Sequence, residues 1–188
     1  MLLIEPLSVT VLPAAFLGWI YESEAVSRIR RTYSKGDPPV GKVLFACCKY
    51  AIAIPWGGMI LRSWNPPIPP PGGLSVLKWF ALALWMIGFA LLFAGRLSMG
   101  PAFRPDLPRE KTRLAVRGVF RFSRNPMYLG IDTTLAAAAI YTMNPFVLAF
   151  GIFIAAVHHK IVRAEELKLR SVFGGEYEDY CRRVHRYL

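Results

Sequence analysis

The sequence has 188 residues, of which 54% are hydrophobic and 19% are charged, and its formal net charge is +11. A water-soluble domain of this length must cover itself with polar side chains, which here are too few and too clustered. The three cysteines, two of them adjacent at Cys47 and Cys48, exclude a disulfide framework and a spaced set of metal ligands. Length and composition therefore predict a single integral membrane domain over residues 1–188, with no metal site.

Three apolar runs in the first half of the chain are long enough to cross a bilayer, which takes roughly 20 mostly apolar residues. The first covers 2–21 and contains Pro13, which predicts a kink in its helix. The second covers 43–61, and the third covers 74–97, directly after a stretch rich in proline and glycine. The sequence therefore predicts three membrane-spanning helices within residues 1–97.

A fourth apolar region, 127–162, is too long for one span and is interrupted at Asn144-Pro145. A residue that precedes proline disfavours the helical conformation. Two helices of about 17 residues each are therefore predicted, at the short end of the spanning range. They form a transmembrane helical hairpin within the segment 98–188.

The tail from residue 163 onward is polar and basic, with a predicted helix that runs through Val172 and breaks at Gly174-Gly175. The predicted fold is thus all-α. It is a polytopic membrane helix bundle with five transmembrane helices, the last two a hairpin, followed by a C-terminal tail.

Lysine and arginine are distributed unevenly between these spans. They cluster in 22–42, in 96–126 and in the tail from residue 160, whereas only Arg62 and Lys78 flank the loop between the second and third spans. Positive charge marks the cytoplasmic side of a membrane protein, so the N-terminus is predicted outside and the C-terminus in the cytoplasm. Topology accounts for the basic composition, and nucleic acid is not a predicted partner.

Three polar motifs lie on the predicted cytoplasmic side of the last third of the chain. They are Arg124-Asn125-Pro126-Met127-Tyr128, then Glu165-Glu166, then Phe173-Gly174-Gly175-Glu176-Tyr177 with Tyr180, Arg183 and Val184. A hairpin brings the first two together, which makes Asn125 and Glu165 neighbours. Each of these two motifs alone is typical of a helix end, although acids at a helix C-terminus oppose the helix dipole. Their combination indicates a functional site.

These motifs, in this order, resemble those of the isoprenylcysteine carboxyl methyltransferase family, and more loosely those of the phospholipid N-methyltransferases. The resemblance extends from Thr112 to Val184, whereas the N-terminal part matches only in hydropathy. It implies S-adenosylmethionine as the cofactor, bound in a cytoplasmic pocket. It also implies that the methyl acceptor is a lipid-like or prenylated small molecule, reached from the surrounding membrane lipids.

The resemblance further implies which residues contact the cofactor: Thr112, Arg113, Leu114, Ala115, Phe120, Asn125, Pro126, Met127, Tyr128 and Glu165. A carboxylate such as Glu165 suits the ammonium or sulfonium charge of the cofactor, or its ribose hydroxyls, and nearby cationic and amide groups suit its carboxylate. Three positions depart from the family pattern. Asn125 replaces a histidine, Phe120 replaces a tyrosine, and Ile161 replaces a substrate-binding arginine.

Two other polar positions lie in the hairpin. Asp132 is close to the membrane interface, where an acid is either paired with Arg121 or Arg124 or belongs to the site. His158 and His159 are adjacent, so only one of them can face a given site. This spacing favours interfacial histidines, or one contact to a glutamate, over a metal pair.

We therefore predict methyl transfer to a lipophilic acceptor, first of all to the carboxylate of a prenylcysteine-like substrate. A carboxylate needs a cation, for which Arg183 is preferred to Lys160 and Arg163 because it lies in a motif shared with the family. Arg183 and Asp132 are the predicted catalytic residues. Within the enzyme class, the alternative acceptors are a phospholipid amine and a small thiol, each of which must lose a proton. Outside it, the alternatives are a non-catalytic protein on the same scaffold and a reductase-like relative that binds NADPH.

Overall fold

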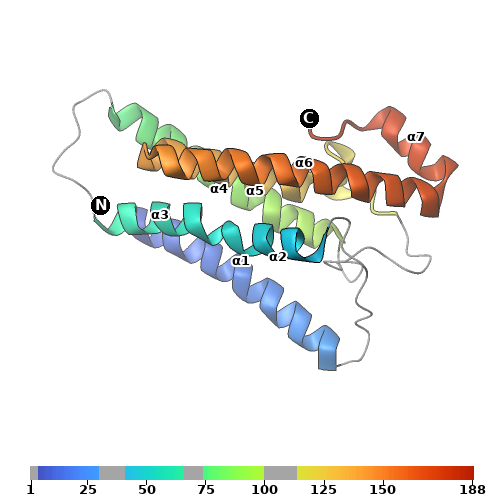
Figure 1. The fold of residues 1–188 in the computed structure, drawn as a ribbon, viewed down its shortest axis with the longest axis horizontal. Coiled ribbons are helices and arrows are strands. Elements are labelled where there is room, and N and C mark those ends of the chain that lie inside the picture. The colour runs from blue at the N-terminus through green and yellow to red at the C-terminus, as the bar shows by residue number, and fades with distance from the viewer. Residues whose placement is uncertain (1–3, 30–40, 66–73, 100–113) are drawn as a thin grey trace.

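The computed structural model describes residues 4–29, 41–65, 74–99 and 114–188 (Figure 1). These ranges contain helices and no strand, as predicted. The helices are α1 (Ile4–Ile29), α2 (Lys42–Ala51), α3 (Ala53–Trp64), α4 (Leu74–Met99), the short 3-10 helix η2 (Gly118–Arg121), α5 (Pro126–Thr142), α6 (Pro145–Phe173) and α7 (Gly175–Arg183).

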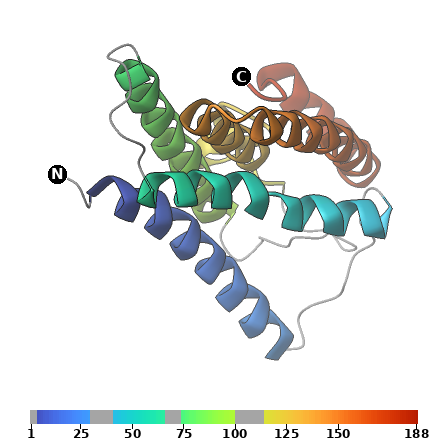
Figure 2. The same ribbon diagram turned by 60° about the vertical axis from the view of Figure 1, so that its left-hand side comes forward.

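Helices α4, α5 and α6 pack together along most of the molecule, and α1 and α3 cover one side of this group (Figures 1 and 2). α5 and α6 run antiparallel, because Tyr128 near the start of α5 contacts Glu165 late in α6, whereas Leu135 lies beside Gly151. The start of α5 and the end of α6 therefore lie at the same end of the bundle, where α7 and the C-terminus also lie (Figure 1).

Three of the described helices are long and apolar enough to cross a membrane, namely Ile4–Glu22, Val76–Met99 and Pro145–Phe173. The first and third predicted spans are thus confirmed as candidate spans. Large apolar side chains on these helices are exposed, as expected for a surface that faces lipid. They include Phe80 and Ile87 of α4, and Phe146 and Ile152 of α6.

The second predicted span is not one helix. The sequence predicts a span over 43–61 that is interrupted by Lys49 and Pro55, and the chain forms α2 and α3 with a turn at Ile52 between them. Pro55 accounts for the break, because the proline ring clashes with the carbonyl group four residues earlier, here that of Ala51. The second span therefore stays a prediction, to which both α2 and α3 would contribute. The predicted loop 22–42 also begins later than expected, since α1 continues to Ile29.

Two predicted helix boundaries are confirmed. The side-chain oxygen of Asn144 accepts hydrogen bonds from the backbone N–H groups of Phe146 at 2.8 Å and Val147 at 3.3 Å, so it caps the N-terminus of α6. At the other end, α6 stops at Phe173, before Gly174, whose φ of +54° lies in a region that favours glycine.

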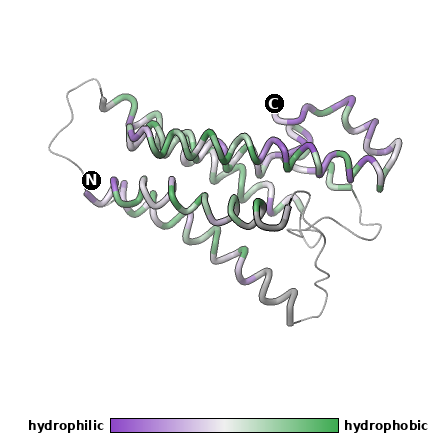
Figure 3. Tube along the Cα trace, in the orientation of Figure 1, coloured by the Kyte–Doolittle hydropathy of each residue, from purple (hydrophilic) through white to green (hydrophobic). Residues whose placement is uncertain are grey.

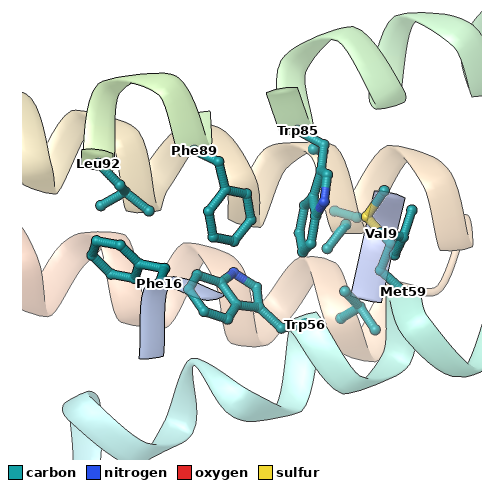
Figure 4. Close-up of a cluster of buried hydrophobic side chains, with 11 residues drawn as sticks. Val9, Phe16, Trp56, Met59, Trp85, Phe89 and Leu92 are labelled. Carbon is teal, nitrogen blue, oxygen red and sulfur yellow. The ribbon is translucent and has the colours of Figure 1, made fainter. Parts of the chain in front are cut away.

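The core holds an aromatic cluster between α3 and α4, drawn in Figure 4. The ring of Trp56 lies 6.0 Å from that of Trp85 and 5.1 Å from that of Phe89. α4 also approaches α5 closely, because a Cβ atom on Gly88 would lie 2.8 Å from the carbonyl oxygen of Gly130. Only glycines permit this approach, which fixes the position of α5 and the polar side chains that it carries.

Candidate functional site

Polar side chains gather at the end of the bundle where α5 begins and α6 ends. Figure 3 shows the change from apolar to polar residues along the last turns of α6 and through α7. Two groups of side-chain hydrogen bonds at this end involve the acidic pair and its neighbours. One is centred on Glu166, and the other joins α5 to α6 through Glu165 and His158.

Glu166 is 1% exposed and is held by two arginines. Arg124 donates to Oε1 from Nη2 at 2.9 Å and from Nε at 3.1 Å, while Arg186 donates to Oε2 from Nη2 at 2.7 Å and from Nε at 3.0 Å. Both carboxylate oxygens thus accept charge-assisted hydrogen bonds, which are roughly twice as strong as neutral ones. The hydrogen bonds to Glu166 raise the pKa of the Arg186 guanidinium, which keeps it charged.

This Glu166 network ties the C-terminal residues to the start of α5. The backbone N–H of Arg124 donates to the carbonyl oxygen of His185 at 3.0 Å, and its Nη1 donates to that of Val184 at 2.9 Å. The Nδ2 group of Asn125 donates to the carbonyl oxygen of Arg186 at 3.1 Å. Asn125 precedes α5, but its side chain makes no capping bond there. It serves the docking of the tail instead.

The tail is also held by buried tyrosines of α7. Tyr177 and Tyr180 pack with Val184, and the Tyr180 hydroxyl donates to the carbonyl oxygen of Phe120 at 2.7 Å. Burial raises the pKa of Tyr180 to about 12, so the hydroxyl stays protonated and remains a donor. Leu114 packs against the same cluster. α7 therefore positions η2 and the segment before it.

Glu165 differs from its neighbour Glu166. Its Oε1 atom accepts a hydrogen bond from the Tyr128 hydroxyl at 2.9 Å, and its side chain is half-buried. Within 4–29, 41–65, 74–99 and 114–188, no lysine, arginine or histidine forms an ion pair with Glu165. A half-buried carboxylate with no cationic partner among the described residues favours a positively charged ligand, because burial of an unpaired charge is costly.

Asp132 and His158 form a second contact between α5 and α6. Oδ1 of Asp132 lies 2.7 Å from Nδ1 of His158, whose residue is 4% exposed. Of the two alternatives for Asp132, a pair with Arg121 or Arg124 is not seen among the described residues, where Arg124 pairs with Glu166 and Asp132 contacts His158; a place in the site stays a prediction. The ring of His158 meets that of Tyr128 edge to face, with ring centroids 5.3 Å apart.

Comparison with known proteins matches the chain to a family through this part of the sequence. The sequence profile of the phospholipid methyltransferases matches residues 76–176, which is more than half of the chain. The chain belongs to the phospholipid methyltransferase family. The match runs from α4 to the first residues of α7 and includes both acid-bearing contacts between α5 and α6.

Two curated relatives carry a more specific name. Both are called "Probable protein-S-isoprenylcysteine O-methyltransferase", one from Oryza sativa subsp. indica and one from subsp. japonica. Each is 32% identical to this chain over 77 residues, which cover 40% of this chain and 40% of the relative. The aligned part thus spans less than half of either protein.

The predicted cofactor residues of the chain fall into three groups. Tyr128 at the start of α5 donates to Glu165 near the end of α6, and the Nδ2 group of Asn125 donates to the neighbouring Glu166 at 3.4 Å rather than to Glu165. Pro126 is fully buried and Met127 packs into the core beside Gly95, so both face α4. Leu114, Ala115 and Phe120 lie in or before η2, whereas Thr112 and Arg113 fall outside the described residues.

Arg183 lies apart from these contacts. It is exposed on α7, and its Nε donates to the carbonyl oxygen of Asp179 in the same helix at 3.2 Å. Ile161, at the position of the family arginine, is 2% exposed and packs with Val157 and Cys48. The described residues contain no group of three or more His, Cys, Asp or Glu side chains that could hold a metal.

Sequence reasoning missed the roles of Glu166 and Arg186 and underrated His158. Glu166 was visible as half of an acidic pair, but nothing local distinguishes it from Glu165. Arg186 lies beyond the last shared motif, so no pattern singled it out. His158 could have been found from the helical period, because it lies seven residues before Glu165 and therefore on the same face of α6.

Proposed function

We propose that this protein is an S-adenosylmethionine-dependent methyltransferase whose acceptor is a lipophilic molecule reached from the bilayer. The observation that carries the proposal is the contrast between two adjacent acids. Glu166 is neutralised by two arginines, whereas Glu165 has a tyrosine hydroxyl for a partner and no cationic partner among the described residues. A ligand with positive charge would supply the missing cation.

S-adenosylmethionine fits this requirement, because it carries an ammonium and a sulfonium charge and supplies an electrophilic methyl group when bound. In this proposal Glu165 binds one of those charges or the ribose hydroxyls. The hydroxyl of Tyr128 orients Glu165, the Glu166 network holds the start of α5 and the tail, and Tyr180 of α7 holds η2. Positioning of this kind supplies several kcal/mol of the rate enhancement of a displacement reaction.

The first candidate acceptor is the carboxylate of a prenylcysteine-like molecule. The names of the two curated relatives support it. Such an acceptor needs a cation, for which Arg183 remains the predicted residue, and its guanidinium is free of ion pairs among the described residues. An amine or thiol acceptor is the second candidate, which the contact between Asp132 and His158 favours.

We also propose five membrane crossings, with α2 and α3 together forming the second and the antiparallel helices α5 and α6 forming the last two. The N-terminus then lies outside and the C-terminus in the cytoplasm. Single cysteines at Met143 and at Glu176, both exposed, test the hairpin in a chain whose native cysteines are replaced. Labelling from opposite sides is expected, and labelling of both from one side would contradict the hairpin.

Thermal denaturation of the purified protein tests the cofactor. A ligand that binds only the folded state adds about 2.7 kcal/mol of stability at 100 times its Kd. S-adenosylhomocysteine is expected to raise the Tm, and NADPH is not. Stabilisation by NADPH alone would favour the reductase alternative. Stabilisation by S-adenosylhomocysteine without methyl transfer to any acceptor would favour a non-catalytic binding protein.

A further inference from the structure

Two contacts join α5 to α6 on one face. Tyr128 and Asp132 are four residues apart on α5, and Glu165 and His158 are seven residues apart on α6. These spacings place each pair on one side of its helix, about one and two turns apart. The contact between Asp132 and His158 therefore lies further into the bundle than the contact between Tyr128 and Glu165, on the same face.

The chemistry of the partners fixes the tautomer of His158. A carboxylate oxygen only accepts hydrogen bonds, so the 2.7 Å contact requires that Nδ1 of His158 carries the proton and donates it to Oδ1 of Asp132. In the neutral ring the other nitrogen, Nε2, then has a free lone pair. Of the described residues, none provides a hydrogen-bond partner for Nε2.

His159 provides a natural contrast. It is adjacent in the sequence, but it is exposed, and its Nδ1 contacts the hydroxyl of Tyr187 at 3.0 Å. His158 instead is buried, paired with an acid and in ring contact with Tyr128, whose hydroxyl donates to the proposed cofactor-binding Glu165. His158 is thus oriented by an acid, and its Nε2 has no hydrogen-bond partner among the described residues. An imidazole of this kind, beside a proposed ligand-binding carboxylate, has the geometry of a general base.

We propose that His158, oriented by Asp132, accepts the proton of the methyl acceptor through Nε2. The inference rests on the proposed methyl transfer and concerns acceptors whose nucleophilic atom carries a proton, such as an amine or a thiol. The lone pair of the acceptor forms the bond to the methyl carbon, the carbon–sulfur bond breaks with its electron pair going to sulfur, and the acceptor proton passes to Nε2. His158 becomes an imidazolium, which the Asp132 carboxylate stabilises. A carboxylate acceptor releases no proton and needs no such base.

The activity test compares His158→Asn with His159→Asn in the full-length protein. The asparagine amide nitrogen replaces Nδ1 as a donor to Asp132 but leaves no acceptor in place of Nε2. Tritiated S-adenosylmethionine is supplied with phosphatidylethanolamine vesicles, with dodecanethiol, or with an S-farnesylcysteine analogue. We expect His158→Asn to lower kcat for an amine or thiol by at least about 100-fold, with S-adenosylhomocysteine binding within about threefold of wild type. His159→Asn is expected to change neither quantity by more than about threefold.

A second readout does not depend on activity. The chain has three histidines, His158, His159 and His185, so ¹⁵N spectra of the imidazole nitrogens are assigned with the two asparagine variants and by elimination. We expect His158 to be protonated at Nδ1 and bare at Nε2. In Asp132→Asn the side-chain amide also donates, which allows the opposite tautomer. Asp132→Asn should therefore populate Nε2–H at His158 and lower kcat, while Tm stays close to wild type.

The possible outcomes separate the inference from the proposed function. If the wild type transfers label to the amine or thiol and His158→Asn does so at the same rate, the inference is wrong and the proposed function stands. The inference is also wrong, and the function again stands, if label enters the S-farnesylcysteine analogue alone as a base-labile ester, or if His158 carries its proton on Nε2. If S-adenosylhomocysteine fails to bind and no acceptor is labelled, the proposed function fails and the inference with it.

Discussion

The two acids of the Glu165-Glu166 pair are neighbours in the sequence but belong to different regions of the molecule. Glu166 lies in a closed network with Arg124 and Arg186, where both of its oxygens are occupied. Glu165 lies on the face where α5 and α6 also meet through Asp132 and His158. The difference teaches that paired charge at this end of the bundle holds the scaffold together, while the acid without a cationic partner among the described residues is the one that we propose for a ligand.

This division follows from the position of each residue on α6. Successive residues of a helix point about 100° apart, so adjacent acids must face different surroundings. Glu166 points to the docked tail, and Glu165 points to Tyr128 of α5. In the proposed site, the Glu166 network thus supports the surrounding segments, and the contacts of Glu165 and His158 with α5 supply the chemistry. Changes in the two regions should therefore affect different measurements.

The largest effect is expected for Glu166→Gln. Removing one partner of a buried ion network leaves the others uncompensated and typically costs about 3–5 kcal/mol. The free energy of unfolding should fall by this amount, and amide hydrogen exchange should show faster exchange in 175–188. Glu178→Gln is the matched control, because the ion pair of Glu178 with Arg170 is exposed and is worth about 0–1 kcal/mol. Equal destabilisation by both variants would contradict a scaffold role for Glu166.

Glu165→Gln should affect binding instead. Its expected effect is a loss of S-adenosylhomocysteine affinity of at least about tenfold, since a hydrogen bond to a charged group is worth about 1.5–3 kcal/mol. Stability without ligand should stay close to wild type or rise, because the variant removes an uncompensated charge. Calorimetric titration measures the first quantity and thermal denaturation the second. An unchanged Kd with an intact fold would remove Glu165 from the proposed site.

A smaller effect is expected for Tyr128→Phe, which removes the hydroxyl that donates to Glu165. Tyr128 acts on the ligand only through the position of Glu165, so the affinity for S-adenosylhomocysteine should fall by about two- to tenfold, which corresponds to about 0.5–1.5 kcal/mol. Glu165→Gln and Tyr128→Phe act on one contact, so the double variant should lose less than the sum of the two single losses. Full additivity would show that Tyr128 and Glu165 act independently.

How much of the fold and of the candidate site could be predicted from the sequence depends on how far apart the interacting residues lie along the chain. The turn at Asn144-Pro145 is predictable because the cap and the proline act on their own neighbours. The same local reasoning predicted the first and third spans, which correspond to the candidate spans Ile4–Glu22 and Val76–Met99. It did not place the break in the second predicted span. Pro55 acts on the turn that precedes it, and the chain there is divided into α2 and α3.

The pairing of charges is harder to predict than the helices. Arg124 is 42 residues from Glu166, and Arg186 is 20 residues from it, so neither pairing follows from spacing along one helix. A pair between Arg124 and Asp132 was one option from the sequence. The sequence alone does not show that the guanidinium of Arg124 binds the carboxylate of Glu166 instead. The antiparallel order of α5 and α6 was predictable, and it was sufficient to bring the first two motifs together.

The smallest effect is expected for Arg183→Ala, compared with Arg186→Ala. Arg183 is exposed and bonds within its own helix, so its loss should change S-adenosylhomocysteine affinity by less than about twofold and leave the Tm unaltered. Arg186, three residues later, holds Glu166 through two hydrogen bonds, and its loss should cost about 1.5–3 kcal/mol of stability. If Arg183 binds an acceptor carboxylate, Arg183→Ala should slow methyl transfer to the S-farnesylcysteine analogue and to no other acceptor. The affinity for the cofactor should then stay unchanged. Destabilisation by Arg183→Ala equal to that by Arg186→Ala would mean that the closed network extends over α7, and that the boundary drawn between the two regions is misplaced.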